Sequence, residues 1–153
     1  MDGSPGSERR EAALSSAMRV EQLADSLSQA AAALHAAVIR AIRKRASLGE
    51  AGISQAEAQA VFALEVELRQ QANTLYADAA GHAITGLDTA QRQLSGLLDA
   101  VRQRIARHDH VSHWISLATG LLNLGRAVLA RSPERILATF DTVRERLQEV
   151  AGE

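Results

Sequence analysis

The sequence predicts an all-α protein, folded as an elongated antiparallel bundle of four helices. Only two prolines, Pro5 and Pro133, interrupt its 153 residues, and hydrophobic residues recur at three- and four-residue steps along most of the chain. Aromatic residues make up 3% of the chain, while alanine, leucine, arginine and glutamine are abundant. This composition favours helices over sheets. We expect a disordered polar lead over residues 1–7 and a single helical domain over residues 8–153.

The first helix is expected to begin after Ser7, which can act as its N-cap, and to end near Leu48. Its hydrophobic residues form one stripe at helical spacing, which predicts a single buried face. The stripe comprises Val20, Leu23, Ala24, Leu27, Ala30, Ala31, Leu34, Ala37, Val38, Ala41 and Ile42. Small side chains over residues 29–38 should let a partner helix approach closely.

The second helix is expected to open at Ser54, because Ser54 and Glu57 have the spacing of a capping box. Its predicted buried face is Val61, Leu64, Leu68, Leu75 and Ala79. The two long helices would then form a hairpin, joined by a loop over residues 49–53.

Residues 77–86 leave two topologies open. Gly81 and Gly86 each weaken a helix by about 1 kcal/mol relative to alanine, but a hydrophobic seam passes through them without losing register. The seam comprises Ala77, Ala80, Ile84, Leu87, Gln91, Leu94, Leu98, Val101 and Ile105. Its unbroken register favours one helix over about 55–108, and a break at Gly81–Gly86 would give five helices instead. Gln91 is a polar seam residue of the kind that fixes register.

Two shorter helices are expected after this point. The first, over about 110–131, is widely apolar and should lie centrally in the bundle. Ser132, Pro133 and Glu134 suit the N-cap and first turn of the last helix. Its predicted buried face is Ile136, Phe140, Val143, Leu147 and Val150.

The stretch Arg107–Trp114, RHDHVSHW, holds three of the five histidines and the only tryptophan. His110 and His113 have the spacing of a shared metal site, but neither topology brings His35 and His82 to them. We therefore predict a helix–helix corner, with Asp109 capping the next helix and His110 stacked beside Trp114. No metal site and no cofactor are predicted here.

Catalytic motifs are absent from the sequence. There is no cysteine, no phosphate-binding loop and no nucleophile elbow, and no glutamate precedes a histidine by three residues as di-iron bundles require. We accordingly expect no enzymatic activity, no catalytic residue and no small-molecule substrate.

Two basic runs are the candidate contacts for an anionic surface. They are Arg40, Arg43, Lys44 and Arg45 in the first helix, and Arg102, Arg104 and Arg107 in the second run. The structural interpretation of the first run is that cations complement the helix dipole at a C-terminus. Four helices would separate the two runs, whereas five would place them at the same tip. No aromatic residues for base stacking lie near the first run, which disfavours nucleic acid as a partner.

The expected function is a non-enzymatic interaction module, a scaffold or adaptor that uses exposed helical faces to bind a protein partner or a second copy. The alternative is a membrane-surface or targeting bundle of a secreted effector, with the basic runs on anionic lipid. Lys44 is the only lysine among 17 basic residues, which suits a GC-rich bacterial genome or an effector that avoids lysine. The start of the sequence lacks signal-peptide features, so we expect a cytoplasmic protein, or one secreted without a cleavable signal.

Overall fold

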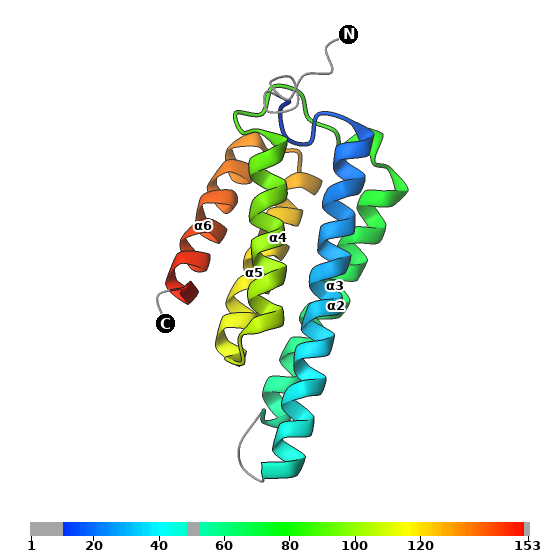
Figure 1. The fold of residues 1–153 in the computed structure, drawn as a ribbon. Helices are drawn as coiled ribbons and strands as arrows, with labels where there is room; N and C mark the ends of the chain where they lie inside the picture. The colour runs from blue at the N-terminus through cyan, green and yellow to red at the C-terminus, as the bar shows by residue number, and fades with distance from the viewer. Residues whose placement is uncertain (1–10, 49–52, 152–153) are drawn as a thin grey trace.

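The computed structural model describes residues 11–48 and 53–151, and the described residues form five α-helices (Figure 1). They are α2 (Ala17–Leu48), α3 (Gln55–Ala77), α4 (Gln91–Arg107), α5 (Val111–Leu129) and α6 (Pro133–Ala151), with a short 3-10 helix η1 (Ala80–His82) after α3. The all-α prediction is confirmed, and the arrangement is the five-helix alternative.

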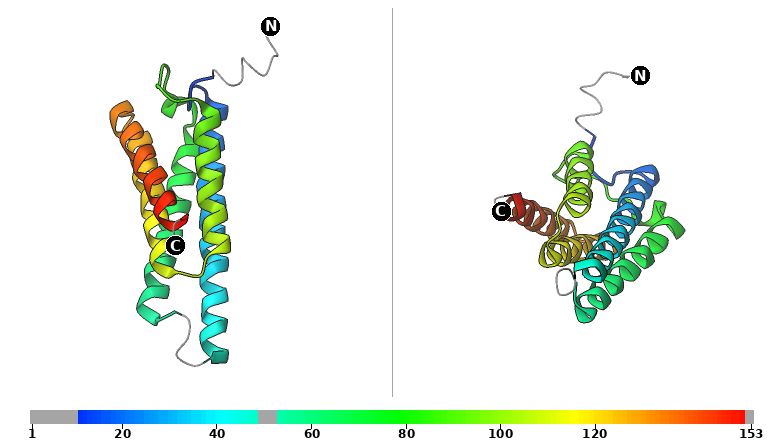
Figure 2. Two further views of the ribbon diagram at one scale, coloured as in Figure 1. Left: turned by 60° about the vertical axis from the view of Figure 1, so that its left-hand side comes forward. Right: turned by 60° about the horizontal axis from the view of Figure 1, so that its bottom comes forward.

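Helices α2 and α3 form a long antiparallel hairpin, against which the other helices pack. Helix α4 lies along α2, α5 lies along α3, and α6 covers α5 and part of α4 (Figure 2). Helices α2 and α4 run in the same direction, so their C-termini point to the same end of the molecule. The α2–α3 hairpin continues past the corner that joins α4 to α5.

Residues 11–16, which the first predicted helix includes, are not helical, and α2 begins at Ala17 rather than after Ser7. Ser7 lies outside the described residues. Residues 11–16 instead cross the end of the bundle as a strap, paired with the chain just before α4 by an antiparallel bridge between Ala12 and Ala90. The strap buries Ala13 completely, whereas a helix that continued outward into solvent would leave Ala13 exposed.

The expected single helix over 55–108 is wrong. The chain leaves the helix at Asp78, whose side chain accepts a hydrogen bond from the N–H of Gly81, and turns at Gly86, where φ is +75°. Glycine reaches this φ without the steric cost that other residues incur. Ile84 and Leu87 are still buried, but in the loop and not on a helix face. The seam spacing therefore predicted the burial of Ile84 and Leu87 correctly but their conformation wrongly, and Ala77 and Ala80 of the same seam are exposed.

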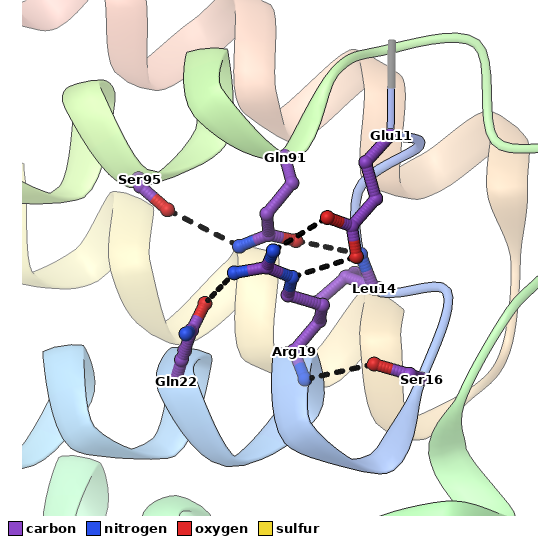
Figure 3. A network of polar contacts seen from close by, with 7 residues as sticks. All are labelled: Glu11, Leu14, Ser16, Arg19, Gln22, Gln91 and Ser95. Carbon is purple, nitrogen blue, oxygen red and sulfur yellow. Dashed lines mark hydrogen bonds and ion pairs between the residues drawn. The ribbon is translucent and has the colours of Figure 1, made fainter. Parts of the chain in front are cut away.

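A polar network ties the strap to the start of α4 (Figure 3). The Gln91 side chain, which is buried, accepts a hydrogen bond from the Leu14 N–H at 2.8 Å and donates one to Ser95 Oγ at 3.1 Å. Beside it, Arg19 binds both carboxylate oxygens of Glu11. The hydrogen bonds from Arg19 lower the pKa of Glu11. Gln91 thus fixes a register, as expected, although it is the register of the strap.

The predicted helix starts at Ser54 and Ser132 are confirmed. Glu57 N–H donates to Ser54 Oγ at 3.1 Å, and Ser54 N–H donates to the Glu57 carboxylate at 3.0 Å. This capping box lowers the pKa of Glu57. At the last helix, Ser132 Oγ accepts from the N–H of Arg135, and Pro133 is the first helical residue.

Two close helix approaches shape the core. The alanine-rich face of α2, including Ala30, Ala31 and Ala37, is buried against α3, as the small side chains predicted. Across the bundle, Gln71 of α3 donates from Nε2 to the Leu122 carbonyl of α5 at 2.9 Å. The central position expected of α5 is confirmed, since most of its residues are buried. Over the described part of the chain, none of the helices has the length and apolarity needed to cross a membrane.

Candidate functional site

The parallel course of α2 and α4 decides where the two basic runs lie. Both runs stand at helix C-termini, and α4 starts beside the strap that leads into α2. The α4–α5 corner consequently lies against the C-terminal part of α2, where Arg40 and Lys44 line a cavity together with Asp109 of the corner. The sequence predicted this juxtaposition only for the five-helix alternative.

The cavity lies at the step where the α4–α5 corner stops and the hairpin continues. Its volume is about 350 Å³. It is lined by Arg40, Ala41 and Lys44 of α2 and by Asp109, Val111 and Trp114 of the corner and α5. We call it the step cavity. It combines an apolar floor with two cations on one side and one carboxylate on the other.

Trp114 is the fixed part of that floor. Its side chain is 1% exposed, and its Nε1 donates a hydrogen bond to the carbonyl of His108 at 2.8 Å. This hydrogen bond fixes the His108 backbone and the Trp114 indole relative to each other. A buried tryptophan whose N–H has a partner is a stable wall, because moving it would leave a buried donor unpaired.

Three of the predicted contact residues make polar contacts within the chain. Arg45 donates from Nη1 to the Ile53 carbonyl at 2.8 Å, across the hairpin loop. Arg102 forms an ion pair with Asp99 one turn earlier in α4. Arg104 places Nη1 3.3 Å from Nε2 of His108.

The other four predicted cations are Arg40, Arg43, Lys44 and Arg107, and all four are exposed. Arg43 and Arg107 are exposed, and neither makes a hydrogen bond or ion pair with any residue that the structure describes. Arg40 is likewise exposed, but it lines the step cavity, as does Lys44. Within the two basic runs, Arg40 and Lys44 therefore line the step cavity.

The corner differs from the prediction in two details. His110, not Asp109, is the residue that precedes the first turn of α5, and its side chain makes no capping hydrogen bond. The His110 ring lies beside His113, with ring centroids 4.9 Å apart, and not beside Trp114. Asp109 is thereby left exposed at the rim of the step cavity.

The two histidines outside the corner have partners of their own. His35 Nδ1 is 3.0 Å from the Glu65 carboxylate, and the ring of His82 is 2.8 Å from the Asp78 carbonyl. Among residues 11–48 and 53–151, no group of three histidine, aspartate or glutamate side chains is arranged to hold a metal ion.

A second cavity lies at the far end of the hairpin. Its volume is about 390 Å³, and it is lined by Ile42, Arg45, Ile53, Ser54, Gln55 and Ala58. Ile42, which the sequence placed on the buried stripe of α2, is 40% exposed there. The hydrophobic stripe of α2 therefore continues past the part of the helix that other helices cover. We call residues 40–45 and 53–58 the hairpin end.

Sequence reasoning found the basic runs and missed the apolar floor beneath them. The available signal was the spacing of Arg40, Ala41 and Lys44, which places two cations on one face of a helix beside a small residue. Nothing in the spacing could show that Val111 and Trp114 would meet this face. Two cations above an apolar floor can bind a carboxylate that is attached to an apolar group. Comparison of the chain with protein-family models, with curated proteins and with solved structures finds no match.

Proposed function

We propose that the chain is a non-enzymatic interaction module, a scaffold or adaptor that binds a protein partner through the hairpin end. The observation that carries the proposal is that the α2–α3 hairpin continues past the α4–α5 corner, with one cavity at the step and a second at the far end of the hairpin. Ile42 is 40% exposed at this end. Exposed apolar surface framed by charged residues is typical of protein-binding sites.

Charge favours a different protein over a second copy as the partner. Arg40, Arg43 and Lys44 are all exposed at the hairpin end. Two hairpin ends docked on each other would bring these like charges together, which is unfavourable in a desolvated interface. A partner with an acidic surface would meet them with complementary charge. We further propose that the protein is bacterial and cytoplasmic, as expected from the sequence.

The proposal is tested by comparing the proteins that co-purify with three forms of the chain from its own cells. The forms are the wild type, the triple variant Arg40→Glu, Arg43→Glu, Lys44→Glu, and a matched variant Arg131→Glu, Arg135→Glu at the opposite end of the bundle. Arg45 is left intact because it holds the hairpin loop. We expect a partner that is lost from the triple variant and retained by the matched variant. An identical set of proteins with all three forms would contradict the proposal.

An anionic membrane surface is the second candidate. The observation that favours it is that α2 and α4 point to the same end of the bundle, with exposed Arg40, Arg43 and Lys44 in α2 and exposed Arg107 at the end of α4. Peripheral binding of this kind depends on basic clusters and weakens as salt rises. It would suit an effector exported to a host cell. Co-sedimentation with phosphatidylserine vesicles at low salt, lost in the triple variant, would support it, and no co-sedimentation would remove it.

A further inference from the structure

We propose that the step cavity receives an apolar side chain of the partner, and that Arg40 and Lys44 bind a carboxylate next to that side chain. The inference rests on the proposed function, which brings a protein partner to the hairpin end, and it names the chemistry by which the partner is recognised. The occupant is a linear segment in which aspartate or glutamate neighbours leucine, isoleucine or phenylalanine.

The shape of the cavity supports an apolar side chain as its occupant. Ala41 contributes only a methyl group to the lining, which leaves space between α2 and the corner. Val111 and Trp114 form the opposite wall, and the indole is fixed by its hydrogen bond to His108. At about 350 Å³ the cavity is near the small end of the range for ligand sites. It suits one side chain held by a preformed wall, with little ordering cost on binding.

The charges at the rim support a neighbouring carboxylate. Arg40 and Lys44 are one helical turn apart and both line the cavity, so two cations belong to the same side of it. Arg40 has no hydrogen bond or ion pair with the described chain, so its guanidinium can bind a carboxylate with two parallel hydrogen bonds. Asp109 of the corner also lines the cavity, and its carboxylate repels a ligand that is anionic all round. A lining of two cations and one carboxylate therefore suits a ligand with one carboxylate beside an apolar group better than a polyanion.

The test selects ligands without knowing the partner. A displayed library of random twelve-residue peptides is selected against the full chain, and enriched peptides are made without tryptophan. Trp114 is the only tryptophan, so its fluorescence reports on the cavity wall during titration. We expect enriched sequences to pair an acidic residue with a bulky aliphatic or phenylalanine residue, and we expect binding to shift the Trp114 emission.

Three variants locate the binding. Arg40→Glu should weaken binding about tenfold or more, because it reverses a charge that contacts the ligand. Ala41→Phe should weaken binding by a similar factor while keeping every cation, because it fills the cavity. Arg135→Glu is the matched control, since it reverses an exposed arginine at the opposite end of the bundle. It should leave the affinity close to that of the wild type. Circular dichroism establishes whether each variant is folded. If Ala41→Phe does not fold, the test of the inference rests on Arg40→Glu alone.

The outcomes separate this inference from the proposed function. Enriched peptides that bind Arg40→Glu as tightly as the wild type would overturn the inference, and a partner lost from the triple variant would still support the proposed function. A selection that enriches no peptide also overturns the inference. Phosphatidylserine vesicles form the last arm. A vesicle-induced shift of Trp114 emission that Arg40→Glu and Ala41→Phe both abolish would identify a lipid headgroup as the occupant, and would overturn the peptide assignment.

Discussion

Gln91 Oε1 accepts a hydrogen bond at 2.8 Å from the backbone N–H of Leu14, which lies 77 residues earlier in the chain. This bond joins the strap before α2 to the first residue of α4. The two helices therefore start at the same end of the bundle and run in parallel. Because α2 and α4 start together, the corner after α4 lies beside the C-terminal part of α2. The position of the step cavity therefore depends on where α4 starts.

Gln91→Leu should destabilise the fold by about 1–3 kcal/mol, because it leaves the buried N–H of Leu14 without its acceptor. Urea unfolding measures the loss, and amide hydrogen exchange at Leu14 should become faster. The control is Gln70→Leu on the exposed face of α3, which should stay within about 0.5 kcal/mol of the wild type. Equal losses from the two variants would show that the strap is not held by Gln91.

The ion pair between Glu11 and Arg19 should make stability depend on pH in the acid range. The hydrogen bonds from Arg19 lower the pKa of Glu11 in the folded protein from its ordinary value of 4.5. The carboxylate therefore stabilises the folded state fully above pH 4.5, and the contribution is lost as pH falls through the lowered folded pKa.

Above pH 4.5, Glu11→Gln should lower the free energy of unfolding by about 0.2–1 kcal/mol, as expected for a partly exposed ion pair. At pH values below the lowered pKa of Glu11, the substitution should change the stability little. Arg19→Gln should remove the same pH-dependent part, since the pair needs both residues. The measurement is the free energy of unfolding as a function of pH. If Glu11→Gln gave a curve parallel to the wild type throughout, the pair would not carry the pH dependence.

Gly125→Ala should destabilise the contact between α3 and α5. A Cβ at this position would lie 2.1 Å from Oε1 of Gln71, and the amide cannot move without losing its bond to the Leu122 carbonyl. We expect a loss of about 1–3 kcal/mol. Gly96→Ala, which places its Cβ in open space on α4, should instead stabilise the protein by about 0.5–1 kcal/mol. Thermal unfolding compares the two, and changes of the same sign would contradict the described packing.

Arg45→Ala should weaken the hairpin end, whereas Arg43→Ala should not. Arg45 donates to the Ile53 carbonyl, so its loss should cost about 0.5–1.5 kcal/mol. Arg43 makes no bond with the described chain, and its loss should stay within about 0.5 kcal/mol. Chemical denaturation measures both. Similar losses would mean that the arginines of this run do not divide into a structural and an accessible set.

The buried faces of the helices could be predicted from the sequence, because a helix that packs on one side repeats its apolar residues every three or four positions. Phe140 and Val143 in the last helix and Leu117 and Leu121 in α5 are buried as that spacing requires. The start of α3 was also predictable, since the Ser54 capping box is a local interaction that needs no tertiary context.

The break between α3 and α4 could not be predicted with the same means. Ile84 and Leu87 keep the helical register and are buried, yet the loop that carries them is held by contacts with the strap. The N–H of Ile84, for example, donates to the carbonyl of Leu14. Such a contact between distant segments leaves no periodic signal. The apolar floor of the step cavity could not be predicted for the same reason, because Trp114 and Ala41 line one cavity only in the five-helix arrangement.

Site-specific photo-crosslinking from Ile42 tests the central claim most directly, namely that the hairpin end is the surface that binds the partner. A benzoylphenylalanine at Ile42, which is 40% exposed, is compared in cells with one at Val66, which is 52% exposed in the middle of α3. We predict a discrete crosslinked protein from position 42 and none from position 66. No adduct from position 42, or the same adducts from both positions, would contradict the account.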